Sequence, residues 1–331
     1  MVDFRYHLVS LIAVFMALAV GVVLGAGPLQ NSLGRALNDQ VESLRDSRDQ
    51  ARIDADEANQ RASAYESGLE TLAPEMVADT LTGQSVLLVS MPGASAETVE
   101  RHRANLIEAG ASVTGSVEIT EEFFSAERAT YRNALAGQLG SYVEPADSPI
   151  GTLARGLEFI ATTDAQDPGA ATLTELFKAS DNALIEVKET LTAPATAILV
   201  IGPADEDVPA EAETVDETVL LNKIEFLSAI DTPMVFAGND GTGTLLEALR
   251  AGDADVSTVD TPDDATALIN VPFALTQELS DSTVTWGVGQ SAELVLGSPV
   301  ELALEPGAEE GEGTAGDPPN ENPVEPTADE S

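Results

Sequence analysis

The pattern of the chain opens with a long apolar run. Residues 8–26, LVSLIAVFMALAVGVVLGA, contain no charged side chain, and Ser10 is the only polar one. At about 1.5 Å per residue, a helix of this length spans just under 30 Å, the thickness of the hydrocarbon core of a bilayer. We therefore predict a transmembrane helix over residues 8–27. Arg5 and the terminal amine favour a cytoplasmic N-terminus of residues 1–7, with the rest of the chain outside.

A cleaved signal peptide is the alternative interpretation of this run. Gly25-Ala26-Gly27 offers small residues of the kind that a signal peptidase accepts. However, Pro28 would follow the most favourable cut, and the apolar run is longer than the usual signal core of ~7–15 residues. We therefore expect an uncleaved signal-anchor helix.

Small residues recur at every fourth position of the apolar run. They would share one helix face, where two backbones could approach closely. Alanine and glycine are also common in membrane helices, so the spacing alone is weak evidence of a contact. The predicted helix–helix contact residues in this segment are Ala13, Ala17, Gly21 and Gly25.

Residues 28–73 change to a heptad pattern. Apolar residues alternate at spacings of three and four, and mostly polar residues stand between them, which predicts a coiled coil. The positions are Val41, Leu44, Arg48, Ala51, Ala55, Ala58, Ala62, Tyr65, Leu69 and Leu72. Four alanines make the seam thin, and Arg48 interrupts it. A single amphipathic helix lying on the following domain would show a similar stripe, but we favour self-association, with Val41, Leu44, Leu69 and Leu72 as contact residues. Pro74 should end the coil.

From residue 83 to residue 304, short apolar runs alternate with helical patterns. This alternation predicts an extracytoplasmic α/β domain with a mostly parallel sheet of βαβ units. The predicted strands are Ser85–Ser90, Ala111–Ile119, Ala197–Ile201, Met234–Ala237 and Val256–Val259. One predicted helix begins after Ser95 and ends at about Ala109. The others cover Val215–Ile230, Thr244–Ala251 and Asp263–Asn270. Glu121–Lys178 should form a helical insertion, and Val284–Leu296 one more strand or hairpin.

The last segment, residues 305–331, contains nine acidic side chains, no basic ones and many prolines and glycines. Such a segment buries too little apolar surface to order itself, so we predict a disordered acidic tail.

Composition narrows the chemistry of the whole chain. Asp and Glu number 57 and Lys and Arg 15, a net charge of −42, which repels nucleic acid. Only three of the basic residues are lysines, which fits a surface kept soluble at high salt. The sequence has no cysteine and only two histidines, His7 and His102. Disulfides, thiolate nucleophiles and Cys-built metal sites are therefore excluded, as is a His-rich metal centre within one chain.

Loops at three predicted strand ends are candidates for ligand contact, because ligands of such sheets bind beyond the carboxyl ends of the strands. None carries a phosphate-binding fingerprint, and glycine and proline in such loops also serve ordinary turns. The acidic run from Asp205 to Glu217 lacks the spacing of a calcium loop, and we interpret it as solvated. His102, between Arg101 and Arg103, is expected at the surface. We predict no catalytic residue and no bound cofactor.

Two motifs resemble a known family. The run from Tyr6 to Gly25, together with Val259-Asp260 and Trp286-Gly287-Val288-Gly289, is similar to the MctB family of actinobacterial copper transporters. The order of anchor, coil and α/β domain agrees over about 300 residues.

The resemblance implies a cell-envelope protein that lowers intracellular copper, described for the family as an outer-membrane channel, with copper as the transported ion. It carries over no copper ligand, and copper(I) prefers Cys and Met sulfur. Met91 is the least unsuitable candidate among five methionines. One apolar span per chain has no polar face to line a pore, so conduction would require a homo-oligomer. The alternative is a membrane-anchored envelope scaffold that binds envelope proteins and transports no metal.

Overall fold

The computed structural model describes residues 3–179, 183–204, 216–252 and 254–302. The chain divides into two compact units, Met1–Leu69 and Glu70–Ser331. The first unit is helical, and we call the second the α/β domain. The acidic tail and residues 205–215 of the acidic run lie outside the described residues, so their predicted character stays a prediction.

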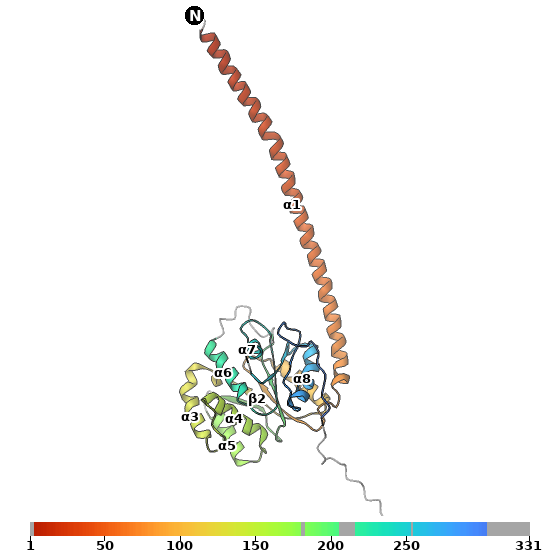
Figure 1. The fold of residues 1–331 in the computed structure, drawn as a ribbon, viewed down its shortest axis with the longest axis vertical. Helices are drawn as coiled ribbons and strands as arrows, with labels where there is room; N and C mark the ends of the chain where they lie inside the picture. The colour runs from red at the N-terminus through yellow and green to blue at the C-terminus, as the bar shows by residue number, and fades with distance from the viewer. Residues whose placement is uncertain (1–2, 180–182, 205–215, 253, 303–331) are drawn as a thin grey trace, which may run out of the picture. The chain divides into compact units, whose positions relative to one another are not determined.

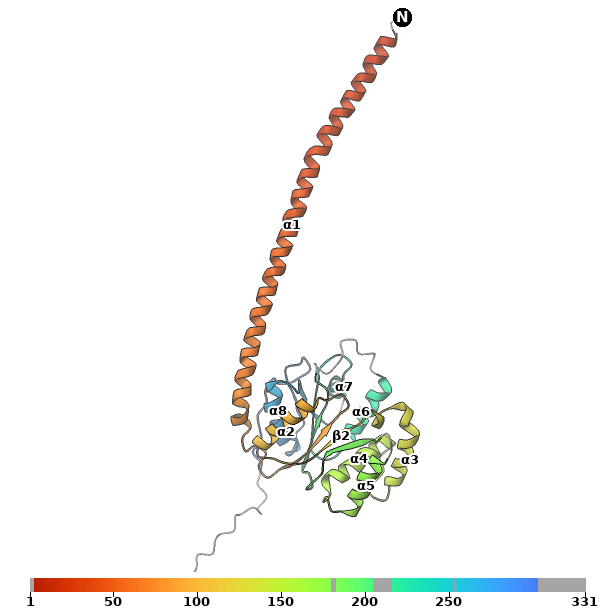
Figure 2. The ribbon, with the colours of Figure 1, turned by 180° about the vertical axis from the view of Figure 1, so that it is seen from behind.

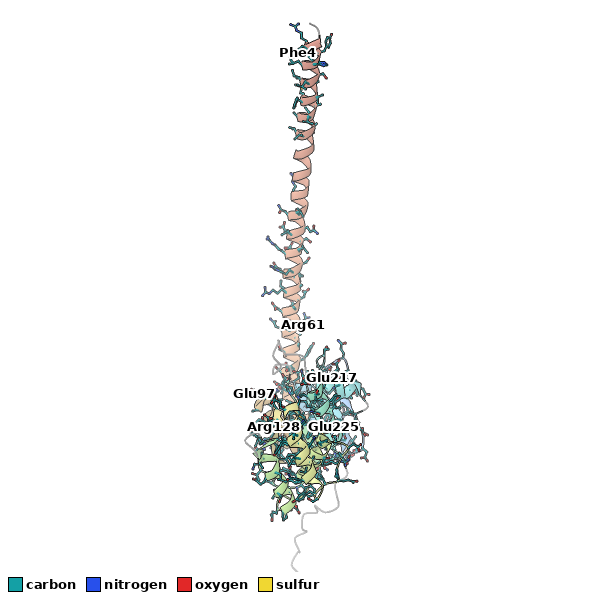
Figure 3. All side chains as sticks on the ribbon, turned by 90° about the vertical axis from the view of Figure 1, so that its left-hand side faces the viewer. Phe4, Arg61, Glu97, Arg128, Glu217 and Glu225 are labelled. Carbon is teal, nitrogen blue, oxygen red and sulfur yellow. The ribbon has the colours of Figure 1, made fainter. Side chains whose placement is uncertain are left out.

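A single helix, α1, runs from Asp3 to Val77, so the predicted membrane segment and the predicted coil segment are continuous (Figure 1). Within it, Phe4–Gly25 is long and apolar enough to cross a membrane, and none of its side chains is buried. The described side chains near Phe4 and near Arg61 project from the helix on several sides (Figure 3). Pro74, where we expected the coil to end, lies inside α1, and the helix continues for three more residues.

The last turn of α1 belongs to the α/β domain and explains why the helix continues. Ala73 and Val77 are almost fully buried there, and Leu81, beyond the helix, is buried with them. Packing of these side chains stabilises the last turn despite the missing N–H of Pro74. The chain then turns at Asp79, which has a φ of 61°.

The domain is built on one seven-stranded sheet, confirming the predicted α/β class. Its strand order is β3-β2-β1-β4-β5-β6-β7, and every neighbouring pair is parallel except β2 with β3. The strands are β1 (Ser85–Ser90), β2 (Ser112–Ile119), β3 (Ile185–Glu189), β4 (Ala197–Ile201), β5 (Met234–Gly238), β6 (Ser257–Asp260) and β7 (Thr285–Trp286). The edge strand β3 was not predicted, because its alternation of apolar and charged residues is short and only Ile185 is fully buried.

Helices cover both faces of the sheet. On one face α2 (Ala96–Glu108) lies beside α8 (Ala265–Glu278), and both views show them together (Figures 1 and 2). The other face carries α4 (Pro149–Thr162), α6 (Glu217–Ser228) and α7 (Leu245–Ala251). The central strands are therefore buried on both sides: all five residues of β4 and of β5 are inaccessible, as their apolar runs predict.

The predicted helical insertion is confirmed between β2 and β3. It contains two short 3₁₀ helices, η1 (Glu121–Phe123) and η2 (Ala126–Arg128), followed by α3 (Ala129–Leu139), α4 and α5 (Pro168–Lys178). Four phenylalanines join it to the sheet face and α6, with ring centroids 5.1–6.3 Å apart: Phe123, Phe124, Phe177 and Phe226. One pair is stacked, one is tilted and two are edge-on, and such contacts add to the stabilisation from burial of the rings.

Helix α8 is longer than predicted and contains Pro272. A proline inside a helix cannot donate to the carbonyl four residues earlier, here that of Leu268. Asn105 of α2 supplies the missing donor, because its Nδ2 donates to the Leu268 oxygen at 2.6 Å. The Asn105 side chain of α2 thus donates to the carbonyl oxygen that Pro272 of α8 leaves without a donor.

The expectation that His102 lies at the surface was wrong. Its side chain is fully buried between α2 and the start of α8, and its Nε2 lies 2.7 Å from the Pro262 carbonyl oxygen. Since a carbonyl only accepts, Nε2 carries a proton. Burial lowers the pKa of His102 to about 4, and the neighbouring Arg101 lowers it too, against the effect of the Pro262 hydrogen bond.

Candidate functional site

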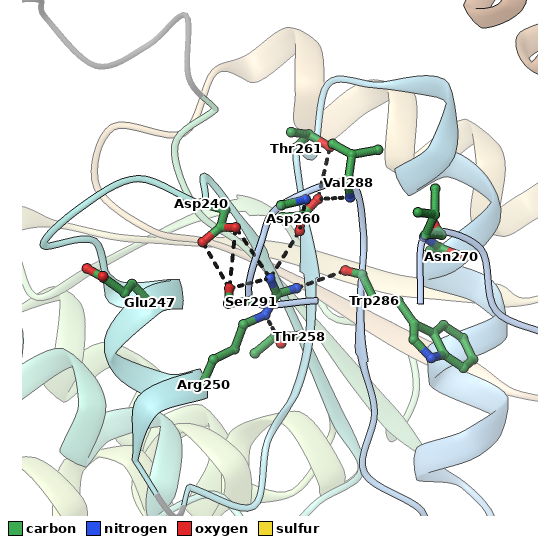
Figure 4. Close-up of polar contacts among 12 residues, drawn as sticks. Asp240, Glu247, Arg250, Thr258, Asp260, Thr261, Asn270, Trp286, Val288 and Ser291 are labelled. Atoms are coloured by element: carbon green, nitrogen blue, oxygen red, sulfur yellow. Dashed lines mark hydrogen bonds and ion pairs between the residues drawn. The ribbon is translucent and has the colours of Figure 1, made fainter. Parts of the chain in front are cut away.

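Two motif segments that lie far apart in the sequence meet at the carboxyl ends of β6 and β7. Asp260 is the last residue of β6, and its side chain is fully buried. The backbone N–H of Val288 donates to its Oδ1 at 2.7 Å, and that of Gly289 donates to its Oδ2 at 3.0 Å (Figure 4). A buried carboxylate requires such partners, and the loop after Trp286 supplies them.

Arg250 neutralises this carboxylate from α7. Its side chain is only 3% exposed, and its Nη1 donates to Asp260 Oδ2 at 3.0 Å. Its Nη2 donates to the Trp286 carbonyl oxygen at 2.9 Å, and its Nε donates to Thr258 Oγ1 at the same distance. The guanidinium therefore joins α7, β6 and the segment after β7 in one set of hydrogen bonds (Figure 4).

A second carboxylate closes the set. Asp240 follows β5, and one of its oxygens lies 3.7 Å from Arg250 Nη1. Ser291 Oγ accepts a hydrogen bond from Arg250 and lies 3.1 Å from Asp240 Oδ1, to which it donates. We call Asp240, Arg250, Asp260 and Ser291 the Arg250 network. It links the ends of three neighbouring strands with one cation and two carboxylates.

The glycines of the motif are explained by how closely the backbone approaches these carboxylates. A Cβ on Gly287, whose φ is 142°, would lie 1.9 Å from Asp260 Oδ1. A Cβ on Gly289 would lie 1.7 Å from Asp240 Oδ2. No side chain fits at either distance, so the spacing Trp-Gly-x-Gly is what lets the backbone N–H groups reach the acids.

The contacts of the Arg250 network favour a structural role. Each carboxylate and each guanidinium nitrogen already has a partner within the network or in the backbone around it. Ser291, its one hydroxyl side chain that could act as a nucleophile, faces a carboxylate and a guanidinium and not a histidine, so it lacks the base that activation requires. The network fixes the strand ends and the segment that follows them.

Comparison with known proteins shows the family of this chain. The family described as "Copper transport outer membrane protein, MctB" matches residues 1–296. The chain belongs to the MctB family. Its motif residues Asp260 and Trp286–Gly289 lie within the matched range, so the MctB match includes both segments that the Arg250 network joins.

The curated relatives match most of the length of the chain. "Copper transporter MctB" of Mycobacterium tuberculosis (strain H37Rv) is 28% identical over 317 residues, which are 88% of this chain and 98% of the relative. The proteins of the same name from Mycobacterium bovis and Mycobacterium leprae are also 28% identical, with the same coverage. Among solved structures, a putative aspartate carbamoyltransferase from Leishmania major Friedlin matches with a TM-score of 0.12 at 17% identity, covering 60% of this chain and 80% of that one. That value is too low to support an argument about fold.

Copper ligands do not gather in the described part of this MctB chain. No group of three or more His, Cys, Asp or Glu side chains there could hold a metal ion. Met91 lies in the hydrophobic core and is 1% exposed, and Met234 is 4% exposed. The thioether of Met91 is therefore not open to a passing ion.

The predicted helix–helix contact residues of the MctB chain all lie on α1. Val41, Leu44 and Leu72 are 44%, 64% and 51% exposed, and Leu69 is half-buried. A Cβ added to Gly21 or Gly25 would meet nothing within 4 Å. Ala13 and Ala17, the other predicted contact residues, are also exposed. Their contact with a second helix stays a prediction.

Arg250 was missed in the sequence, although a signal existed. It is the only basic residue after Lys223, in a stretch of more than a hundred residues that is rich in acids. A lone cation there has to be either a surface residue or the partner of a buried acid. Asp260 at the end of an apolar strand was the acid to pair it with.

Proposed function

We propose that this chain is a single-pass protein of the cell envelope that contributes to copper transport or homeostasis as a homo-oligomer. The observation that carries the proposal is the family match over residues 1–296, since the relatives named above are called copper transporters. The apolar stretch Phe4–Gly25 supports the membrane part of the proposal.

In this proposal, residues 8–27 anchor the chain and residues 1–7 stay in the cytoplasm. Arg5 lies on the short N-terminal side of the apolar stretch, and the next basic residue downstream is Arg35. A short basic flank favours the cytoplasmic side, so the α/β domain, predicted over residues 83–304, would lie outside the cytoplasm. Envelope proteins would then be the partners within its reach.

Copper would be cargo in this proposal, and no resident cofactor is needed. The apolar stretch of α1 has no polar face, so one copy cannot line a path for an ion. Several copies would have to assemble. The small residues Ala13, Ala17, Gly21 and Gly25 could bring the membrane helices together, and the seam from Val41 to Leu72 could continue the contact outside the membrane.

The test of the copper role is the amount of copper in cells. Elemental analysis would compare a deletion strain, its parent and a strain complemented with the full-length gene, all under copper load. We expect a several-fold rise in cell-associated copper in the deletion strain that the complementing gene reverses. Unchanged copper would contradict the proposed role.

The test of the oligomer is the mass of the full-length protein in detergent. Removing Val41–Leu72 should convert an oligomer into a monomer, because the deletion removes the whole predicted seam. Fluorescence of Trp286, the chain's one tryptophan, would check that the α/β domain still unfolds in one transition. An oligomer that survives the deletion would contradict the role of the seam.

A membrane-anchored scaffold without metal transport is the second candidate. The observation in its favour is that the described residues offer no metal-binding group and that Met91 is buried. The same strains separate the two candidates. A scaffold predicts normal copper together with a change in envelope permeability that the full-length gene reverses.

A further inference from the structure

A cavity of about 550 Å³ opens beside the carboxyl ends of β1 and β2. It is lined by the loop after β1, the segment after β2 and the start of α6, and we call it the Lys223 cavity. In the strand order of the sheet, β1 stands between β2 and β4, so the chain leaves β1 in one direction and later returns on its other side. Ligands of open α/β sheets bind at such a reversal of strand order. The volume is within the range of sites that hold small molecules.

Lys223 brings a cation to the wall of this cavity. Its amine lies 5.8 Å from the centroid of the Phe124 ring, and Phe124 is 1% exposed. The preceding residue, Asn222, donates from Nδ2 to the Phe124 carbonyl oxygen at 2.9 Å, which fixes α6 against the cavity wall. The cation is therefore held in place by its neighbours on the helix.

Among the described residues, the amine of Lys223 has a ring but no carboxylate as its near neighbour. In the described ranges, no carboxylate oxygen lies within the 4.0 Å of an ion pair from it. Burial lowers the pKa of Lys223, and the more distant charge of Glu121 acts in the opposite direction. A partly buried cation without an ion pair is costly, and such groups concentrate at binding sites.

Three carboxylates line the same cavity: Glu121, Glu127 and Asp216. All three residues are exposed. Asp216 also caps α6 by accepting from the Thr218 N–H at 2.9 Å. A simple anion would meet these three acids on its way to Lys223, and a simple cation would be repelled by Lys223 itself. A molecule that carries both charges avoids both penalties.

We propose that the Lys223 cavity binds a small zwitterion, an amino acid or short peptide with free termini. Its carboxylate would lie on the Lys223 amine and its ammonium group beside Glu121 and Glu127. Phe124 would contact the apolar part between the two charges. The proposal is independent of copper and concerns only the α/β domain of the full-length protein.

The probe is the dipeptide Ala-Ala, added to the full-length protein in detergent, with thermal unfolding and calorimetry as readouts. At about ten times its Kd we expect it to raise the Tm by roughly 3–5 °C. N-acetyl-Ala-Ala lacks the ammonium group and Ala-Ala amide lacks the carboxylate, so each should bind about tenfold more weakly or worse. Equal binding of all three, no binding of Ala-Ala, or an equal shift with inorganic phosphate would overturn the proposal.

Two variants locate the binding. Lys223→Met replaces the cation by an apolar side chain of similar length and should lower the affinity for Ala-Ala about tenfold or more. Lys178→Met is the matched control, because Lys178 lies on α5 in a half-exposed pair with Glu175, and it should leave the affinity unchanged. Retained binding by Lys223→Met would overturn the proposal.

A third variant keeps the test decisive if Lys223→Met does not fold. Glu127→Gln removes one exposed charge, and no hydrogen bond of its carboxylate appears among the described contacts, so the domain should remain folded. It should weaken Ala-Ala about threefold and leave the already weak N-acetyl-Ala-Ala unchanged, because only the ammonium group faces this acid. Unchanged affinity of Glu127→Gln for Ala-Ala would contradict the assignment of the acids.

Discussion

The two units of the chain place their apolar and charged side chains in opposite ways. On α1, Phe15 is 63% exposed and Leu44 is 64% exposed, and the ion pair of Arg61 with Glu57 is exposed on both sides. In the α/β domain, β4 is buried along its whole length, and Arg250 pairs with Asp260 almost out of contact with solvent. The domain buries these side chains against partners in the same chain, whereas the side chains of α1 named here are exposed.

This difference shows which interactions can stabilise each unit. Burial of apolar side chains and partners for buried charges can hold the domain together by themselves. An isolated helix in water gains little from exposed ion pairs. In our proposal, α1 therefore depends on lipid along Phe4–Gly25 and on a second copy along the seam. Substitutions of the same kind should therefore have different effects in the two units.

The largest expected difference concerns arginine. Arg250→Met leaves the buried charge of Asp260 without its cation, with only two backbone N–H groups and the Thr261 hydroxyl as donors. It should lower the free energy of unfolding of the domain by about 3–5 kcal/mol. Urea unfolding followed by Trp286 fluorescence measures it, and the Trp286 carbonyl is itself a partner of Arg250. Arg61→Met, which breaks an exposed pair on α1, should cost less than about 0.5 kcal/mol. Equal costs for the two variants would remove the distinction between the units.

The second prediction uses the two histidines, one in each unit. His102 is neutral in the folded domain, with a pKa of about 4 against 6.5 when unfolded. Below pH 6.5 the unfolded chain binds a proton that the folded chain does not, so stability falls as the pH falls from 6.5 towards 4. The loss should reach about 3 kcal/mol. Above pH 6.5 this histidine should contribute no slope.

The measurement is the difference in unfolding free energy between the wild type and His102→Gln at several pH values from 7 to 4. Taking the difference cancels the carboxylates that titrate in the same window. His7→Gln, on the exposed N-terminal end of α1, is the matched control and should leave the slope unchanged. An identical slope in the wild type and His102→Gln would show that burial of His102 has no thermodynamic cost.

The sequence predicted elements better than it predicted contacts. Periodicity placed β1 and β4 at their observed bounds, because strands buried on both faces are continuous apolar runs. It ended the last predicted helix at Asn270, whereas α8 passes Pro272 and reaches Glu278. What lets that helix continue is the Asn105 side chain from another helix, and local pattern carries no information about such a partner.

The candidate site shows the same limit. Asp260 and the glycines after Trp286 were visible as a motif, but their meeting depends on β7 pairing with β6. Arg250 joins them from α7, and the local pattern does not predict that this helix faces the end of β6. His102 was misplaced because two arginine neighbours suggest solvent, while the burial comes from the packing of α2 on α8.

The third prediction tests the contact between α2 and α8. Asn105→Ala leaves the Leu268 carbonyl without its donor and should cost about 2 kcal/mol of domain stability. In the background of Pro272→Ala, residue 272 regains an N–H that can reach that carbonyl, so the same substitution should cost about 1 kcal/mol less. Unfolding of the two single variants and the double variant gives the coupling. Strict additivity would contradict the pairing of Asn105 with the gap at Pro272.

The smallest expected effect lies on α1 and tests whether its stripe meets a second copy. Arg48 occupies a seam position, its side chain is 71% exposed, and its ion pair is with the adjacent Asp49. If two helices meet along the seam, Arg48→Leu removes two charges from the interface and buries apolar surface instead, and self-association should strengthen by about 1 kcal/mol per chain.

Gln60→Leu is the control for this effect, because residue 60 falls on the opposite side of the heptad and should not change association. Concentration-dependent sedimentation of the full-length protein in detergent measures both variants, and Trp286 fluorescence should show the same unfolding transition in each. If both leucines strengthen association equally, apolar side chains on this helix promote association non-specifically, and the helices do not pair along a defined seam. If only Arg48→Leu strengthens association, the exposed stripe of α1 packs against another copy of the chain. The buried strands of the domain, in contrast, pack against residues of their own chain.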